Sequence, residues 1–212
     1  MKSFETNEMS TGQIHSYLLH AIAPRPIALV STIDREGRVN LSPFSFFNLF
    51  SANPPVCIFS PARRVRDNTT KHTLENVQEV AECVINIVDH SIVYKVNQAS
   101  AEYPKGVNEF IEAGLTELAS LHIKPPRVAE SPVQLECIVK QVIPLGDGAG
   151  AGNLVLAEIK TIHFRENLLD EAGKPIQANF DHVARLGGDW YSRVTTQSLF
   201  ALPKPIEKPL NT

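Results

Sequence analysis

The strongest constraint in the sequence is a series of short apolar, β-branched segments, each ended by proline, glycine or a polar turn. They occupy residues 27–33, 55–59, 82–88, 133–145 and 153–164. Several strands at short spacing, with turns between them and one helical insert, are typical of a small antiparallel barrel. The helices do not alternate regularly with the strands, which disfavours a doubly wound parallel sheet. The sequence therefore predicts a mainly β fold with helical additions.

Helical patterns are confined to a few stretches, and one domain is predicted over residues 1–212. The segment "NTTKHTLENVQEV" predicts a helix with Thr73 as the N-cap, because apolar residues recur on one face after it. A second helical pattern forms an insert near residues 89–120. The tail near residues 193–212 is proline-rich and loop-like.

Composition narrows the class of partner. The chain has 212 residues, of which 43% are hydrophobic, and a formal net charge of −3. This balance argues against nucleic acid as the main partner, whereas the local cluster Arg63, Arg64 and Arg66 suits a small anion. No run approaches the roughly 18 apolar residues of a membrane span, and the N-terminus lacks the apolar core of a signal peptide. We therefore expect a cytoplasmic protein with no membrane contact.

The cysteines and histidines predict no metal site. Cys57, Cys83 and Cys137 are far apart in the sequence, and each is flanked by apolar residues. We expect three buried, unpaired thiols that act as small hydrophobic side chains. No CxxC, HExxH or HxxxH spacing is present.

A glycine-rich segment mimics a dinucleotide-binding motif. Gly146, Gly148 and Ala151 fit the pattern G-x-G-x-x-A, with Asp170 further along the chain. That motif requires a helix directly after the glycines, so that a pyrophosphate meets the helix N-terminus. Here the next segment, "NLVLAEIKTIHF", is rich in β-branched residues, which predicts a hairpin loop, although "LVLAEI" alone is compatible with a helix.

The stretch from residue 40 to 73 carries the best candidate for a ligand site. No G-x-S-x-G elbow or carboxylate pair is present, so no catalytic residue is nominated. A planar, phosphorylated heterocycle needs an apolar wall, hydrogen-bonding groups along its polar edge and cations for its phosphate. The stretch offers Phe44, Phe46 and Phe47 for the wall, Asn40, Ser42, Ser45 and Ser60 for hydrogen bonds, and Arg64, Lys71 and Thr73 for the phosphate. Phe50 is assigned to packing. Taken singly, each of these residues is more often a core, turn or surface residue.

Five segments together resemble a known family. They are "APRPIALVST", "GRVNLSPFSFFN", "NPPVCIFSPARR", "KHTLENV" and "ECVINIV", with the strongest match over residues 23–88 and a further match in "HVARLGGDWYS" at 182–192. The chain resembles the flavin reductase-like proteins of the FMN-binding split-barrel fold, of the flavoredoxin type. The succession of these segments at this spacing is more specific than any one of them.

The resemblance implies a six-stranded antiparallel split barrel that forms a homodimer with FMN near the subunit interface. Members typically pass electrons from a reduced nicotinamide, NAD(P)H, to a flavin, and FAD is a further possible substrate. Others carry electrons on bound FMN and take them from a redox-protein partner. Both functions stay open here, because the sequence has no nicotinamide signature.

The resemblance also implies roles for individual residues. It places along the flavin ring and ribityl chain Asn40, Ser42, Phe44, Ser45 and Phe46. It places along the ribityl chain and phosphate Ser60, Arg64, Lys71 and Thr73. Three residues of the tail would reach toward the partner's site: His182, Arg185 and Tyr191. Many members carry Asp where this chain has His72. A solvent-facing histidine without a binding role is the expectation at that position.

Overall fold

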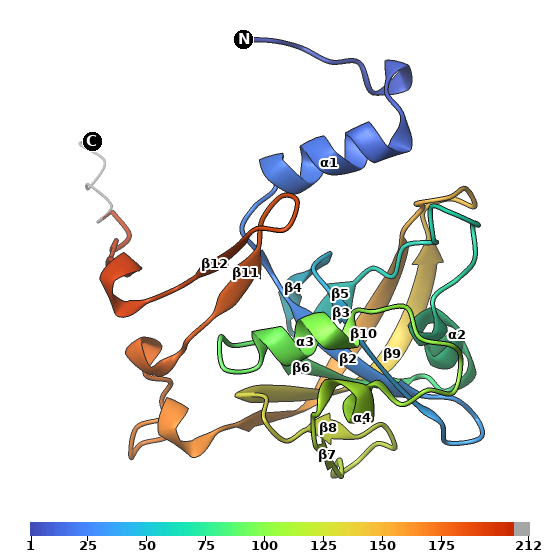
Figure 1. The fold of residues 1–212 in the computed structure, drawn as a ribbon. Helices are drawn as coiled ribbons and strands as arrows, with labels where there is room; N and C mark the ends of the chain where they lie inside the picture. The colour runs from blue at the N-terminus through green and yellow to red at the C-terminus, as the bar shows by residue number, and fades with distance from the viewer. Residues whose placement is uncertain (206–212) are drawn as a thin grey trace, which may run out of the picture.

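The computed structural model describes residues 1–205 and contains one large antiparallel sheet. The seven strands of that sheet run in the order β3-β2-β6-β9-β10-β5-β4 (Figure 1). They are β2 (Ala28–Ile33), β3 (Val39–Phe44), β4 (Phe47–Ala52), β5 (Pro55–Phe59), β6 (Glu82–Ile87), β9 (Val133–Pro144) and β10 (Asn153–Phe164). The predicted mainly β fold is confirmed.

Two strands that follow each other in the chain lie at opposite edges of this sheet. Only Ser45 and Phe46 separate β3 from β4, yet β3 pairs with β2 and β4 pairs with β5. The backbone N–H of Ser60 donates to the carbonyl oxygen of Phe46 at 2.9 Å, which holds the start of β4 against the end of β5. The sheet thus curls until one bent segment links its two edges. Six strands were predicted, and the seventh arises because this segment forms two strands.

The sheet has apolar packing on both faces around β2 and β6. Inside the barrel, Phe44 and Phe59 pack with the apolar residues of β9 and β10. On the outer face, Leu29 and Leu41 pack against Val96 and the other apolar residues of the helical insert. A strand that is covered on both faces reads as a continuous apolar run rather than an alternating one, and all six residues of β2 are buried.

Residues 1–205 contain four α-helices. They are α1 (Thr11–Ala21), α2 (His72–Glu79), α3 (Val93–Ala99) and α4 (Glu109–Ala113), and α3 and α4 form the insert. Helices α2, α3 and α4 pack on the sheet, with α2 on β2 and β3, whereas α1 has no buried residue. The prediction that Thr73 is the N-cap of α2 was wrong, because Lys71 occupies the cap position and no side chain caps the helix.

The glycine-rich segment is a hairpin loop, as predicted. Residues 145–152 join β9 to β10, which pair along their whole length, so no helix follows the glycines. A separate three-stranded sheet consists of β1 (Arg25–Pro26), β11 (Val183–Arg185) and β12 (Tyr191–Arg193). The remaining elements are β7 (Glu117–Leu118), β8 (Arg127–Val128) and the 3-10 turns Thr6–Glu8, Glu166–Leu168, Gln177–Asn179 and Thr196–Ser198. The tail beyond Arg193 has no strand up to residue 205, and residues 206–212 lie outside the described part.

The three cysteines are buried and unpaired, as predicted. Within residues 1–205, none of the helices has the length and apolar character that crossing a membrane requires.

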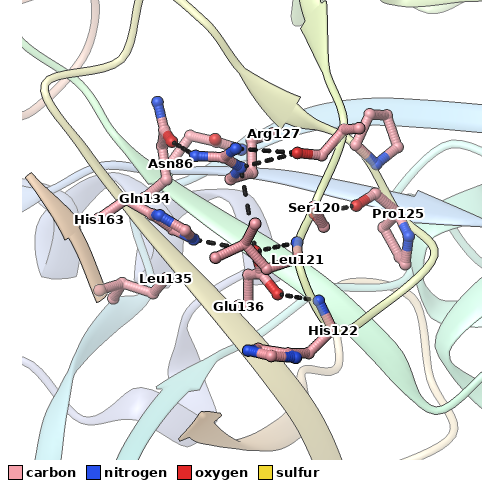
Figure 2. Close-up of polar contacts among 12 residues, drawn as sticks. Asn86, Ser120, Leu121, His122, Pro125, Arg127, Gln134, Leu135, Glu136 and His163 are labelled. Atoms are coloured by element: carbon pink, nitrogen blue, oxygen red, sulfur yellow. Dashed lines mark hydrogen bonds and ion pairs between the residues drawn. The ribbon is translucent and has the colours of Figure 1, made fainter. Parts of the chain in front are cut away.

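A buried carboxylate fixes the segment that leads into β8. Glu136 of β9 is fully buried and accepts hydrogen bonds from the backbone N–H groups of Leu121 (2.7 Å) and His122 (2.9 Å). Figure 2 shows the ring of His163 on its other side, at 2.9 Å. Burial raises the pKa of Glu136, but these hydrogen bonds lower it by more, so the pKa lies below its usual value. Glu136 is therefore a charged group whose partners exist only in the folded chain.

We expect Glu136→Gln to lower the free energy of unfolding by about 3 kcal/mol at pH 7, because an amide nitrogen replaces one accepting oxygen in a buried site. A lowered folded-state pKa stabilises the protein above the unfolded pKa, and that stability is lost as the pH falls through the folded pKa. Urea unfolding at pH 7 and pH 4 should show a smaller difference between variant and wild type at pH 4. Glu171→Gln, at an exposed position, is the control. An equal difference at both pH values would contradict the charged state of Glu136.

Candidate functional site

A groove runs along β3, between that strand and the C-terminal end of α3. One part has a volume of about 370 Å³ and is lined by Phe44, Ser45 and Asn97, together with Arg185 and Tyr191 from the tail. A narrower part of about 80 Å³ is lined by residues that include Asn40, Ser42, Arg64 and Lys71. The two parts share Pro43 and Ser100. We call them the ring end and the cation end of the groove.

The cation end brings together two positive side chains from different segments. The guanidinium of Arg64 donates to the hydroxyl of Thr69 at 3.1 Å and to the carbonyl of Thr70. Glu102 lies 4.0 Å from the Nε atom of Arg64, so it balances that charge only weakly. The ammonium of Lys71 makes no side-chain hydrogen bond or ion pair among the described residues and lies 5.5 Å from the centre of the Phe44 ring.

The pKa values at this end are lowered first by burial and further by neighbouring positive charge. Burial and then the charge of Arg64 lower the pKa of Lys71. Burial is also the largest cause of the lowered pKa of His72, and Arg64 and Lys105 lower it further. His72 lines the groove and is half-buried, so the expectation of a solvent-facing side chain was wrong. An anion at this end would relieve the repulsion between these groups.

The floor of the cation end is a buried polar cluster. The amide oxygen of Asn40 accepts from the hydroxyl of Thr73 at 2.9 Å, and its NH₂ donates to Glu109 at 3.3 Å. The backbone N–H of Leu41 donates to the same carboxylate at 2.9 Å. Burial raises the pKa of Glu109, while its hydrogen bonds oppose that rise. Asn40 is thereby held between α2 and α4.

The structure does not bring every predicted residue to the groove. Thr73 is fully buried, so it supports Asn40 instead of contacting a ligand. Ser60 and Phe46 line neither part of the groove but an apolar hollow that meets the ring end at Ser45, and the hydroxyl of Ser60 accepts from the backbone N–H of Asn153. His182 stacks on Phe180 at 5.0 Å and lines neither part of the groove.

The phenylalanines of β3, β4 and the bend between them lie on different surfaces. Phe44 lines the ring end and also packs on Phe59 at 5.4 Å. Phe47 packs against the barrel core rather than the groove. Phe50 lines neither part of the groove, but it is 64% exposed, so the prediction that it packs within the single chain was wrong.

The insert supplies groove residues that the sequence reading missed. They are Asn97, Ser100, Glu102, Tyr103 and Glu109, and Asp189 joins them from the tail. Isolated polar residues in a helical insert give no motif. Only the packing of α3 and α4 on β3 places them opposite Ser42 and Phe44.

Comparisons with known proteins agree with this architecture. The family model described as "Flavin reductase like domain" matches residues 20–184. The chain belongs to the flavin reductase-like family. An uncharacterised protein of Aquifex aeolicus is 35% identical over 188 residues, which are 89% of this chain and 93% of that protein.

Two solved structures confirm the fold of this flavin reductase-like chain. Nitrilotriacetate monooxygenase component B from Bacillus cereus is 31% identical, with a TM-score of 0.88 over 95% of this chain and 98% of that one. A flavin reductase-type protein with a split barrel domain from Shewanella frigidimarina is 27% identical, with a TM-score of 0.80 over 97% and 100%. The predicted split barrel is therefore confirmed.

The residues of the groove fit the flavin mononucleotide that this family suggests. Arg64 and the unpaired Lys71 suit a phosphate at the cation end. Pro43 and Phe44 offer an apolar wall next to the hydrogen-bonding groups of Ser42 and Ser45. The roles of these side chains toward a flavin remain predictions.

We expect Lys71→Met to weaken FMN binding by roughly 10- to 100-fold, because a charge-assisted hydrogen bond to phosphate is worth about 1.5–3 kcal/mol. Riboflavin, which lacks the phosphate, should lose less than about threefold in affinity. Fluorescence titration of both flavins measures the ratio. Lys124→Met is the charge-matched control, because Lys124 is exposed and lines neither part of the groove. Equal weakening of both flavins would show that the phosphate lies elsewhere.

Proposed function

We propose that this protein is an FMN-binding oxidoreductase that transfers hydride from NAD(P)H to its flavin. The observation that carries the proposal is the charge and shape of the groove. Cations gather at its narrow end, and an apolar wall with hydroxyl groups leads to a wide end. A flat ring with a phosphorylated tail has the matching distribution of groups.

A second cavity adjoins the ring end and gives an electron donor a place to bind. It has a volume of about 520 Å³ and lies between α3 and the β11–β12 hairpin. It shares Asn97, Arg185, Asp189 and Tyr191 with the ring end. A cavity of this size is within the usual range for small-molecule sites. We assign it to the nicotinamide donor.

The chain's own residues have binding and orienting roles in this proposal. Bound FMN supplies the electron-accepting ring, which explains why no acid–base pair is needed. Lys71 and Arg64 hold the phosphate, and Phe44 and Pro43 support the ring and ribityl chain. Tyr191, whose ring lies 4.5 Å under the guanidinium of Arg185, forms the boundary between the flavin and its donor. The free cysteines suit the cytoplasm, where thiols stay reduced.

We expect the purified protein to be yellow and NADH or NADPH to bleach it without oxygen. The measurement is anaerobic absorbance during titration with each nucleotide. Tyr191→Ala should slow bleaching by NAD(P)H at least about tenfold while the bound flavin is still fully reduced by dithionite, since the variant removes the boundary that positions the donor against the ring. A flavin that stays oxidised with both nucleotides would contradict the reductase proposal.

An electron-carrier function is the second candidate, and an exposed aromatic surface favours it. Tyr94 is 80% exposed and Trp190 is 73% exposed, and both lie in the segments around the donor cavity. Aromatic side chains of this kind are enriched at protein interfaces. Reduction by a redox protein such as a ferredoxin, together with failure of both nicotinamides, would identify the carrier. A colourless protein that gains no thermal stability from FMN would exclude both functions.

We further propose that the chain pairs with a second copy of itself through the apolar hollow beside α1. Residues of this hollow include Ile22 (63% exposed), Phe46 (43%) and Phe50 (64%), with Leu145 and Leu154 from the long hairpin. Exposed apolar surfaces of this kind mark association sites. Phe46 adjoins Ser45 of the groove in the chain, so a partner here would lie close to the ring end.

We expect Phe50→Asp to convert the protein to a monomer, because the variant places a charge within an apolar contact. Sedimentation equilibrium measures the association constant, which should fall at least about 100-fold. Phe200→Asp, at a position that is 85% exposed in the tail, is the matched control and should leave association unchanged. A wild-type protein that is monomeric at all concentrations would contradict this assembly.

A further inference from the structure

A buried cation near the ring end has no anionic partner. Arg25 of β1 is only 7% exposed. Its guanidinium donates to three backbone carbonyl oxygens, those of Leu19 (2.7 Å), Ile22 (2.6 Å) and Leu186 (2.9 Å). No carboxylate lies within 4 Å of it in the part of the chain that the structure describes. Buried charges are normally paired, so an unpaired one at a candidate site requires a reason.

A second guanidinium lies next to the first. Arg25 and Arg185 are directly opposite each other in the antiparallel pair β1–β11. Arg185 donates to the carbonyl of Gly188 at 2.9 Å, and like Arg25 it has no carboxylate within 4 Å among residues 1–205. Burial, followed by the charge of Arg185, lowers the pKa of Arg25. Arg185 lines the wall that the ring end shares with the donor cavity, whereas Arg25 lines the apolar hollow beside α1 and meets the ring end through Ser45.

Ser45 connects the buried cation to the groove. The Nε atom of Arg25 donates a long hydrogen bond of 3.5 Å to the hydroxyl of Ser45. Ser45 lines the ring end, and its own hydroxyl proton has no acceptor within the described chain. A hydroxyl that already accepts from a guanidinium is a better donor, because adjacent hydrogen bonds polarise one another. Ser45 is therefore a polarised donor available to a ligand in the groove.

We propose that Arg25, acting through Ser45 and together with Arg185, makes the bound flavin easier to reduce. This inference rests on the proposed function and assigns Arg25 as a positioning residue for it. A hydride carries one proton and two electrons. Its transfer to the ring therefore lowers the net charge of the ring by one. Neighbouring cations and a polarised donor stabilise this added negative charge more than they stabilise the neutral oxidised ring.

The test is the midpoint potential of FMN bound to the intact protein, measured by dithionite titration against a reference dye. Arg25→Gln should weaken binding of the reduced flavin about tenfold more than binding of the oxidised flavin. That ratio corresponds to a midpoint potential about 30 mV lower for a two-electron couple. Ser45→Ala and Arg185→Gln should shift the potential in the same direction.

Arg35→Gln is the matched control. Arg35 is an exposed arginine in the turn before β3, and its side chain has no hydrogen bond or ion pair among residues 1–205, so its removal should leave the potential unchanged. If Arg25→Gln does not fold, Arg185→Gln decides the matter, because its half-buried side chain has one hydrogen bond, to Gly188, and stacks on Tyr191 within the same hairpin. Equal weakening of both flavin states, with an unchanged potential, would overturn this inference. It would leave the proposed function intact, whereas a wild-type protein that binds no FMN would overturn both.

Discussion

The bend between β3 and β4 is the constraint on which the rest of the molecule depends. Only two residues separate β3, at one edge of the seven-stranded sheet, from β4, at the opposite edge. The sheet therefore cannot be flat. The hydrogen bond from Ser60 N–H to the Phe46 carbonyl fixes where this transfer occurs. Because side chains alternate along a strand, the bend also divides its residues between two surfaces. Ser42 and Phe44 reach the groove, Phe46 and Phe50 reach the apolar hollow beside α1, and Ser45 at the bend lines both.

The strands were predictable from the sequence because prolines and turn residues bound them, and the hairpin was predictable because β-branched residues follow the glycines. The assignment of residues to faces was less predictable. Ser60 follows β5 directly and was grouped with Arg64, but the β5–β10 pairing turns its hydroxyl toward Asn153. Thr73 has a good N-cap side chain, yet Asn40 uses its hydroxyl, so Lys71 starts the helix without a capping bond.

The insert and the tail were the parts of the site that no local pattern could place. Glu109 is an isolated acid in a short helix, and it meets Asn40 only because α4 packs against β3. Arg25 stands between two prolines, where a charged residue normally indicates an exposed turn. Two of the carbonyls that bind it, those of Leu19 and Ile22, are near in sequence, but the carbonyl of Leu186 and the β1–β11 register that brings Arg185 beside it come from the far end of the chain. Such contacts depend on the topology of the fold, so the composition and the residue spacing of the sequence do not predict them.

The two ends of the groove separate two kinds of selectivity. In the proposed function, Arg64 and Lys71 at the cation end would act on a group whose charge does not change during a redox cycle, so they would govern which flavin binds. In the same proposal, Arg185 at the ring end and Arg25 behind Ser45 would act on the part of the ligand whose charge does change, so they would govern which redox state is favoured. The two pairs of cations share no hydrogen-bonding partner among residues 1–205. Contributions from groups without shared partners are usually additive. It follows that a change at one end should leave the discrimination at the other end intact, and that the chain can tune its affinity for a flavin and the potential of that flavin independently.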